Sequence, residues 1–448
     1  MNIYSEVFMC KKATKIEEVM LTCGYFPLSS EDLTNFYINT DEARGVNLLQ
    51  ELSVLYKKLP DLCSQVICLG HRGVGKSTMF FQFEQEMNLD YEIVSFSVQD
   101  SFDTEKISFT DLLCLIYKTL LENYKDLLED SDDLQQVYDL WNSTQKEETI
   151  QARSASLKVG AQAECSLGTK LLKLVSQISS TLNFSSDSRR TVTHHIQTFI
   201  TDYIDSLNSL VLMIERKCSK HLLLIIDDLD KISQSSTTDI FVEHPTYFKK
   251  INLRLVLTAP IWLKYMPEFA GVCSSSFTKA VRYPMIAVVD CNHNKIPHGY
   301  NALHDIVMAR VEQSLISDSA LDLAILMSGG QIRDLLEIIS NAAAFCLQVS
   351  GSSIIDDLSV RKAFQNLQES FEDRLRKEDA DILMKIIKNP LDLLDTSYSK
   401  LHELMYSGAI LEYNGKQWRG VHPAAMACLV KSGLLSTDDF RTYTLFDL

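Results

Sequence analysis

Five apolar segments of strand length are spread along the first two thirds of the chain. They are rich in Val, Ile, Leu and Phe, and they occupy residues 66–69, 92–98, 222–226, 253–258 and 285–289. Apolar runs with little polar alternation are typical of parallel strands that are covered on both faces. The sequence therefore predicts an α/β protein with a three-layer core, in which helices cover both sides of a parallel sheet.

A long stretch separates the second predicted strand from the third. From residue 155 to 167 every odd position is apolar, which is the period-2 pattern of a strand with one buried face. This pattern predicts a β-hairpin-like insertion that continues through Leu172 and Leu174. Residues 192–214 carry apolar side chains three or four positions apart, which predicts a long amphipathic helix. The whole insertion, about 128–220, either packs on the core or protrudes toward a partner or a neighbouring subunit.

The last third of the chain has helical periodicity and one hairpin signal. Residues 304–348 predict a small helical lid, and helical segments follow from residue 380. Asn414-Gly415 lies between two short apolar runs, which is a strong hairpin signal. Three helices closed by a hairpin are typical of a winged-helix domain. We expect four parts: an N-terminal segment (1–50), a core (51–300), a lid (301–370) and a winged-helix-like domain (371–448).

Composition and charge limit the classes of partner. The 448 residues carry a formal net charge of -16, which opposes non-specific binding to nucleic acid and to anionic membranes. The eleven cysteines include no C-x-x-C pair, which favours reduced thiols over a zinc framework. Cys291, His293 and His298 share one loop but lack a fourth ligand nearby, so we do not favour a metal site there. The start of the chain does not resemble a secretory signal, and no apolar run approaches the roughly 20 residues that span a bilayer. We expect a cytoplasmic protein without a membrane partner.

A phosphate-binding motif follows the first predicted strand. Residues 70–77 match G-x-x-x-x-G-K-[ST] and lie between a predicted strand and a predicted helix. In such a P-loop the backbone N–H groups and the helix N-terminus face phosphate oxygens. Lys76 is expected to reach the β- and γ-phosphates of ATP, and Ser77 to bind Mg²⁺. The residues predicted to line the nucleotide are Gly70, His71, Arg72, Gly73, Val74, Gly75, Lys76, Ser77 and Thr78.

Three acidic residues follow the third predicted strand, in the order Asp227-Asp228-Leu229-Asp230. Mg²⁺ that bridges two phosphates needs a carboxylate at the end of a strand beside the P-loop, and Asp227 comes first after the apolar run. Asp228 is placed to orient the attacking water as a general base. Asp230 is interpreted as structural, and any one of the three acids could instead cap a helix.

This combination resembles the AAA+ and STAND branches of the P-loop ATPases. The resemblance implies that Thr258, at the end of the strand 253–258, is a sensor 1 residue that contacts the attacking water or the γ-phosphate. Residues 227–231 are also similar to the second motif of the KAP group, in which Arg is preferred at the position of Lys231. Most AAA+ proteins have Glu at the position of Asp228, so the shorter acid implies slow, switch-like hydrolysis.

Two arginines acquire candidate roles from the same resemblance. Residues 328–336 are similar to the sensor 2 region of the origin-recognition initiator ATPases, which implies that Arg333 touches the γ-phosphate and distinguishes ATP from ADP. The alternative is an exposed arginine on a helix. Arg282 precedes the predicted strand at 285–289 and is either an arginine donated to a neighbouring subunit or a surface residue. Residues 36–38 and Arg44 either line the adenine pocket or pack in a core.

The leading functional hypothesis is an ATPase switch that couples nucleotide state to homo-oligomerisation or to binding of a protein partner. The resemblance implies a role in a prokaryotic anti-phage or mobile-element system with a separate effector. The alternatives are a DNA-binding initiator or loader, and an ATP-bound scaffold without turnover. The candidate recognition helix, residues 398–407, carries Lys400 as its only cation, while Lys416 and Arg419 on the wing could contact a DNA backbone. This favours a winged helix that binds protein.

Overall fold

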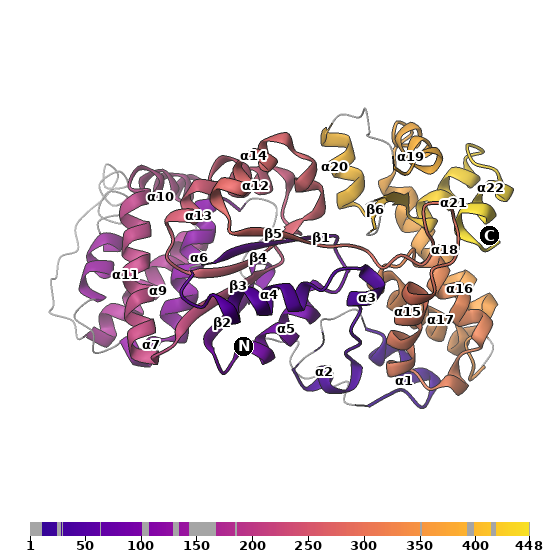
Figure 1. Ribbon diagram of the computed structural model, residues 1–448, viewed down its shortest axis with the longest axis horizontal. Coiled ribbons are helices and arrows are strands. Elements are labelled where there is room, and N and C mark those ends of the chain that lie inside the picture. The colour runs from indigo at the N-terminus through magenta and orange to yellow at the C-terminus, as the bar shows by residue number, and fades with distance from the viewer. Residues whose placement is uncertain are drawn as a thin grey trace.

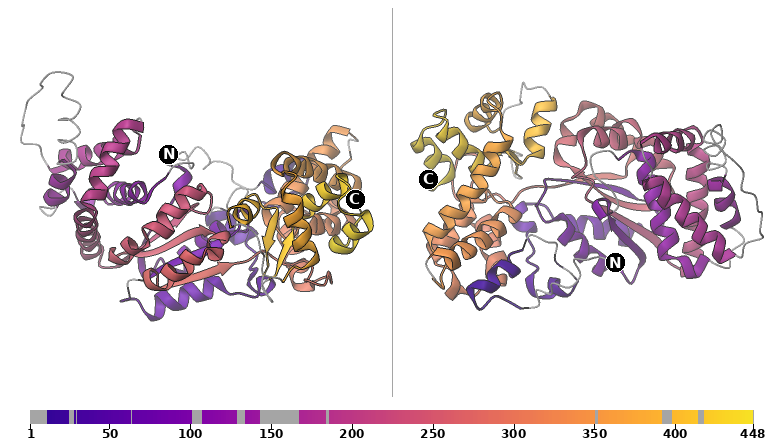
Figure 2. Two further views of the ribbon diagram at one scale, coloured as in Figure 1. Left: turned by 90° about the horizontal axis from the view of Figure 1, so that it is seen from above. Right: turned by 180° about the vertical axis from the view of Figure 1, so that it is seen from behind.

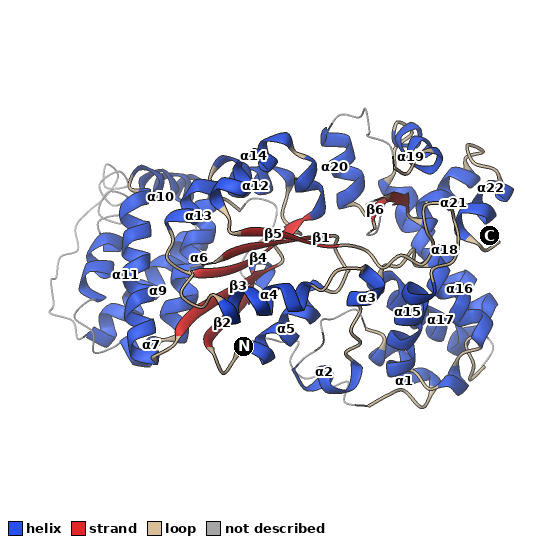
Figure 3. Ribbon diagram, viewed as in Figure 1, coloured by secondary structure: helices blue, strands red, loops and turns tan. Residues whose placement is uncertain are grey.

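A parallel five-stranded sheet forms the centre of the molecule, with helices on both faces (Figures 1 and 3). The computed structural model describes residues 11–24, 28, 30–62, 64–100, 107–128, 134–142, 167–183, 186–349, 352–391, 398–413 and 418–447. The strands are β1 (Gln65–Gly70), β2 (Tyr91–Ser97), β3 (His221–Asp227), β4 (Arg254–Pro260) and β5 (Lys279–Tyr283). They lie in the order β2-β3-β4-β1-β5, and every neighbouring pair is parallel. The carboxyl ends of all five strands therefore meet at one edge.

Four of the five predicted strands are confirmed, and the prediction for residues 285–289 is wrong. The fifth strand is instead β5, an edge strand whose residues Lys279 and Ala280 are exposed. The apolar run that follows β5 packs between the rest of the core and the C-terminal hairpin. Met285 makes an isolated bridge with Tyr413 and donates its N–H to the carbonyl of Glu412 at 3.0 Å. These residues are buried because their loop packs against the C-terminal hairpin, and not because they form a strand.

Alternate residues of the central strands enter two different apolar layers. In β1, Val66 and Cys68 pack in the layer of helices α4 (Leu48–Lys58) and α5 (Lys76–Met87). Ile67 and Leu69 pack in the layer on the opposite face. Because all four side chains are buried, the sheet is covered on both sides. The α/β class and the three-layer P-loop NTPase core are confirmed. The short elements around these layers are α2 (Ser30–Phe36), α3 (Asp41–Arg44), η1 (Val98–Asp100), α12 (Gln234–Thr238), the π-helix η2 (Asp239–Glu243), α13 (Pro245–Lys250), η3 (Ile261–Tyr265) and α14 (Pro267–Ser276).

The described part of the insertion is helical. Helices α6 (Phe109–Asn123) and α7 (Lys125–Leu128) lead into it, and α9 (Leu167–Asn183), α10 (Ser186–Thr198) and α11 (Ile200–Cys218) lie within it. The predicted continuation of a hairpin through Leu172 and Leu174 is wrong, because both residues lie on α9. Leu171, Leu174 and Ile178 are buried while Leu172 is 56% exposed, which is the spacing of a helix. The alternating residues 155–166 lie outside the described chain.

The long amphipathic helix predicted at 192–214 is two helices, α10 and α11, which meet at Phe199. Phe199 is 42% exposed, whereas Ile196 and Tyr203 on either side of it are fully buried. The helices of the insertion and those of the C-terminal part lie at opposite ends of the molecule, with the sheet between them (Figures 1 and 2).

Among the residues described after β5, the elements are helices apart from one hairpin. The elements are α15 (Pro297–Arg310), η4 (Gln313–Leu315), α16 (Asp318–Met327), α17 (Ile332–Val349), α18 (Asp357–Arg374), α19 (Asp379–Lys388), α20 (Tyr398–Tyr406), β6 (Ile410–Glu412), β7 (Arg419–Val421), α21 (Pro423–Lys431) and α22 (Thr437–Thr444). The N-terminal helix α1 (Ile16–Thr22) packs against α17. The hairpin prediction is confirmed by the antiparallel pairing of β6 with β7, although Asn414 and Gly415 themselves lie outside the described residues. None of the helices described is both long enough and apolar enough to span a membrane.

Candidate functional site

The P-loop connects the end of β1 to the start of α5, as its sequence context predicted. Gly73 and Gly75 have φ angles of 71° and 98°, in the left-handed region that glycine adopts without strain. A Cβ atom on Gly73 would lie 2.7 Å from the Cβ atom of Arg333. Glycine is therefore required at position 73 both by the backbone conformation and by the close approach of helix α17.

Lys76 is buried at the start of α5. Its Nζ donates to the carbonyl oxygen of His71 at 2.7 Å and to Oδ2 of Asp230 at 3.0 Å. The Lys76 and Asp230 side chains are only 5% and 3% exposed. Oδ1 of Asp230 is buried as well and has no hydrogen-bond partner among the described residues. Asp230, interpreted from the sequence as structural, is thus the counter-ion of the P-loop lysine.

Asp227 and Ser77 meet at the carboxyl edge of the sheet. The Ser77 hydroxyl donates a hydrogen bond to the Asp227 carboxylate. Burial, followed by the charges of Asp228 and Asp230, raises the pKa of Asp227 to about 6. Carboxylate oxygens of the three acids lie within 4.8 Å of one another. A hard divalent cation prefers oxygen ligands of this kind and would relieve the repulsion among the acids, so the donor set fits Mg²⁺.

Asp228 uses both carboxylate oxygens in contacts with neighbouring side chains. Oδ2 accepts a hydrogen bond from the Ser97 hydroxyl at 2.6 Å, and Oδ1 lies 2.5 Å from Nζ of Lys231. The residue has a φ of 66°, which is uncommon for any residue other than glycine. Ser97 is the last residue of β2 and pairs with Asp227 in the sheet register. Ser97 was not predicted as a site residue, because the whole insertion separates its strand from β3 in the sequence.

Thr258 lies on β4, the strand between β1 and β3. It pairs with Cys68 in the register of β1 and β4, and its side chain is fully buried. Its hydroxyl oxygen accepts the backbone N–H of Leu229 at 2.9 Å. Thr258 therefore supports the loop that carries the three acids.

Arg333 lies at the start of α17, against the P-loop. Its backbone N–H donates to the carbonyl oxygen of Gly73 at 3.3 Å. The preceding Gly330 has a φ of 84°, and a Cβ atom there would lie only 1.7 Å from the carbonyl oxygen of Ile286. This tight glycine turn holds the first residues of α17 beside the P-loop, so the structure brings the proposed sensor 2 residue to the predicted site.

The N-terminal segment reaches the P-loop through Arg44. Its guanidinium is buried, donates to the carbonyl oxygen of Val74 at 2.6 Å and lies 4.1 Å from the centre of the Tyr283 ring. Nε donates to the hydroxyl of Thr40 at 2.8 Å. Arg282 does not precede a strand as predicted, since it lies within β5 and pairs with Leu69. Arg44 braces the P-loop from one side, whereas Arg282 lies on the edge strand.

The side chains of His71 and Arg72 contact the C-terminal part of the chain. Nε2 of His71 accepts the backbone N–H of Glu412 at 2.9 Å. Burial, followed by the nearby charge of Lys76, lowers the pKa of His71 to about 3, so the imidazole is neutral. The Arg72 guanidinium lies 3.8 Å from the centre of the Tyr406 ring. Both P-loop side chains therefore link the predicted nucleotide site to β6 and α20.

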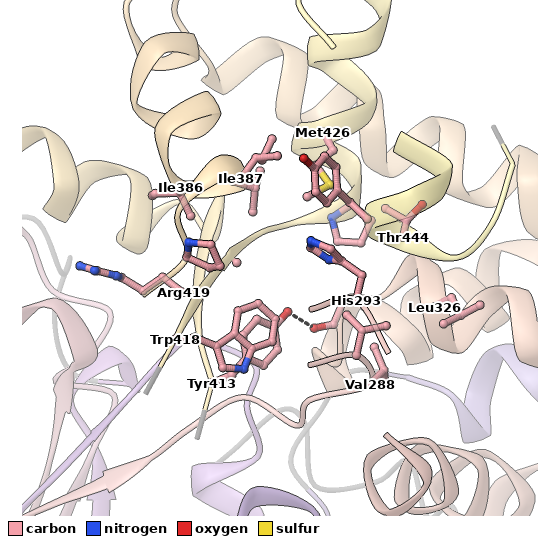
Figure 4. Close-up of a pocket in the computed structure, with 17 residues that line it drawn as sticks. Val288, His293, Leu326, Ile386, Ile387, Tyr413, Trp418, Arg419, Met426 and Thr444 are labelled. Atoms are coloured by element: carbon pink, nitrogen blue, oxygen red, sulfur yellow. Dashed lines mark hydrogen bonds between the residues drawn. The ribbon is translucent and has the colours of Figure 1, made fainter. Parts of the chain in front are cut away.

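A separate cavity lies among α16, α19, α21 and the β6–β7 hairpin (Figure 4). The rings of Tyr413 and Trp418 stack at one side of it, with centroids 4.3 Å apart, and the Tyr413 hydroxyl donates to the carbonyl oxygen of Gly329 at 2.6 Å. His293 lines the cavity and packs against Tyr443. No P-loop residue lines this cavity, so it is separate from the predicted nucleotide site.

No protein-family profile matches the sequence, and no curated protein is significantly similar to it. The chain is similar in structure to the Orc1 protein of Aeropyrum pernix in complex with DNA, at 11% identity and a TM-score of 0.41 over 93% of this chain and 97% of that one. It is also similar to the Walker-type ATPase Paby2304 of Pyrococcus abyssi, at 13% identity and a TM-score of 0.44 over 92% and 99%. The Holliday junction branch migration motor RuvB of Thermotoga maritima has 13% identity and a TM-score of 0.36 over 90% and 98%. Similarity at this level indicates no function for the chain. The function is therefore inferred from the residues of the site.

Proposed function

We propose that the chain is an ATP-binding and ATP-hydrolysing molecular switch that couples its nucleotide state to oligomerisation or to binding of a protein partner. One observation carries the proposal. The Ser77 hydroxyl contacts the Asp227 carboxylate directly beside the buried pair of Lys76 and Asp230. These four side chains come from a P-loop and from the end of β3, and they combine a phosphate-binding cation with the oxygen ligands of a divalent ion.

Each of these residues has a role in holding the nucleotide. The backbone N–H groups of residues 70–78 and the N-terminus of α5 bind phosphate oxygens. Lys76 exchanges Asp230 for the β- and γ-phosphates. Ser77 and Asp227 would hold Mg²⁺, which when bound neutralises charge on the phosphates.

Asp228 is the candidate general base, because it follows the magnesium residue and projects from the same loop. It would orient the attacking water once it leaves its contacts with Ser97 and Lys231. Thr258 keeps the acidic loop in register through Leu229. Arg333, which begins beside Gly73, would contact the γ-phosphate and transmit the difference between ATP and ADP to the lid.

The lid and the C-terminal part would couple the nucleotide state to oligomerisation or partner binding. The lid, about 301–370, carries Arg333, and the C-terminal part, about 371–448, is a winged-helix-like module for a protein partner. The STAND-type switch and a role in prokaryotic anti-phage or mobile-element systems extend this proposal by resemblance. A phage challenge of cells that carry the wild type or Lys76→Ala tests the cellular role, which requires protection by the wild type alone.

The DNA-binding alternative receives less support from the contacts of α20. Nζ of Lys400 lies 2.9, 3.1 and 3.0 Å from carboxylate oxygens of Glu378, Asp379 and Glu403. Three carboxylates around its cation make this helix a poor phosphate-binding surface. A titration of duplex DNA at several salt concentrations distinguishes the two functions, because a DNA-binding initiator requires an affinity that falls steeply as salt increases.

Nucleotide binding is tested by calorimetric titration of MgATP into the purified protein. We expect one site in the wild type and none in Lys76→Ala. Light scattering of the same samples then reports whether the mass of the particle increases with MgATP. Equal heats for the wild type and the variant would show that the P-loop does not bind ATP.

A further inference from the structure

One backbone carbonyl joins three parts of the molecule. The carbonyl oxygen of Lys231, in the acidic loop after β3, accepts from Nη2 of Arg72 in the P-loop at 2.5 Å. It also accepts from the Tyr406 hydroxyl at 3.1 Å. Tyr406 is the last residue of α20, and its ring lies under the Arg72 guanidinium. The P-loop, the acidic loop and the C-terminal helix therefore share one junction.

The side chain of Lys231 acts at the other end of this junction. Its Nζ pairs with Oδ1 of Asp228 at 2.5 Å and donates to the side-chain carbonyl of Gln99 at 3.0 Å. Ser97 occupies the second oxygen of Asp228. Both carboxylate oxygens of Asp228 are therefore engaged by side chains of the protein. In this arrangement Asp228 is not free to orient an attacking water.

Helix α20 is held on the core by contacts beyond Tyr406. The ring of His402 stacks on Trp262 of η3, with centroids 4.4 Å apart, and its Nδ1 lies 3.2 Å from Nε2 of Gln234. In the adjoining strand β6, the Glu412 carboxylate accepts from the Tyr265 hydroxyl at 2.6 Å and also pairs with Lys264. Docking of α20 and β6 therefore keeps the junction at Lys231 assembled.

We propose that Lys231 is a positioning residue that holds Asp228 in an inactive arrangement while α20 is docked, and that nucleotide binding at the P-loop releases α20. The inference rests on the proposed ATPase function and assigns its regulation. Lys76 donates to the carbonyl of His71, and the adjacent Arg72 holds Tyr406. When Lys76 turns toward phosphates, the backbone at residues 71 and 72 loses that restraint. The contacts of Arg72 with α20 and with Lys231 then weaken together, and Asp228 is freed.

Steady-state ATP hydrolysis by four variants tests the positioning role. Tyr406→Phe keeps the ring and removes the hydroxyl, which donates to the carbonyl of Lys231 and accepts from Arg72, while Lys231→Met removes the ammonium that holds Asp228. We expect each to raise kcat by about threefold to tenfold, as for the loss of restraining polar contacts, with KM for ATP changed less than about twofold. Lys231→Arg retains a cation and should stay near the wild type. Tyr443→Phe, which removes a hydroxyl from α22 outside the junction, is the matched control. An unchanged or lowered kcat in both Tyr406→Phe and Lys231→Met would overturn the proposal.

Hydrogen exchange of the wild-type protein tests the release itself. The backbone of residues 400–412 is followed with and without a non-hydrolysable ATP analogue and Mg²⁺, and a fluorescent analogue measures binding in parallel. Faster exchange in this segment when nucleotide is bound supports the release of α20. If nucleotide binds and exchange is unchanged or slower, the proposed release of α20 is wrong, while the proposed ATPase function still stands. Failure to bind nucleotide removes the proposed function and this inference with it.

Discussion

Nζ of Lys76 lies 3.0 Å from Oδ2 of Asp230, and neither side chain is more than 5% exposed. Two charges buried at this depth stabilise a fold only while they are paired, because each has lost its hydration. The pair links the start of α5 to the loop after β3, 154 positions away in the sequence. Asp230 therefore keeps the P-loop lysine in place at the edge of the sheet.

The first prediction separates the structural role of this pair from nucleotide binding. Lys76→Met leaves Asp230 as an unpaired buried carboxylate and should lower the free energy of unfolding by about 3 kcal/mol. The double variant Lys76→Met/Asp230→Asn removes both charges and should recover most of that loss. Urea denaturation measures the stability, and calorimetry should find MgATP binding in neither variant. A double variant as unstable as the single one would contradict the pairing argument.

The second prediction follows from the pKa of Asp227, which burial and the neighbouring acids raise from an ordinary 3.8 to about 6. The folded state binds this proton more tightly than the unfolded state does. The contribution of Asp227 to stability is therefore greatest below about pH 4 and is lost as the pH rises through about 6. Mg²⁺ needs the ionised carboxylate, so its apparent affinity in the presence of ATP should rise by up to about tenfold per pH unit below pH 6 and then level off. Titrations of Mg²⁺ at several pH values measure this, and Asp227→Asn should show no such step.

The third prediction concerns the contact between the P-loop and the lid. Gly73→Ala introduces both a strained φ of 71° and a Cβ atom 2.7 Å from that of Arg333. Gly433→Ala, at a φ of 74°, introduces the strain alone, because no heavy atom lies within 4 Å of the added carbon. Both should lose about 1 kcal/mol of stability from the backbone. Only Gly73→Ala should also weaken ATP binding, by about tenfold or more, since the P-loop or α17 must shift. Equal ATP affinity in the two variants would argue against a functional contact at Gly73.

The fourth prediction tests the docking of the hairpin on the core. Glu412 is 1% exposed and binds Lys264 and the Tyr265 hydroxyl. Glu412→Ala leaves Lys264 without its buried partner and should cost about 3 kcal/mol. The exposed pair of Lys279 and Glu51 provides the control, because Glu51→Ala should change the stability by less than about 1 kcal/mol. Thermal or urea unfolding compares the two, and similar losses would show that the burial of Glu412 has no energetic consequence.

Much of the fold could be predicted because burial on both faces leaves a clear pattern. In β3 and β4 nearly every side chain is buried, so the strands read as continuous apolar runs. β5 escaped prediction because it lies at the edge of the sheet, where Lys279 remains in solvent. Residues 285–289 have the composition of a strand but are buried by packing against another part of the chain. An apolar composition indicates that a segment is buried. Whether that segment pairs as a strand depends on the strands that lie beside it.

The candidate site could be predicted only where its chemistry depends on local spacing. Lys76 and Ser77 are set by the motif, and Asp227 by its position at the end of an apolar run. Their partners come from distant parts of the chain and carry no local pattern. Ser97 is 131 positions from Asp228, and Tyr406 is 175 positions from Lys231. The sequence therefore predicted a nucleotide site, while the contacts that position Asp228 required the folded chain.

Phosphate release by the purified protein tests whether this site hydrolyses ATP. Release is followed over many turnovers with excess MgATP for the wild type, for Asp228→Asn and for Lys76→Ala. We expect slow but sustained release by the wild type, at least about tenfold less from Asp228→Asn although it still binds ATP, and none above background from Lys76→Ala. Identical background rates for all three proteins, with ATP bound by the wild type, would contradict it and leave a nucleotide-binding scaffold.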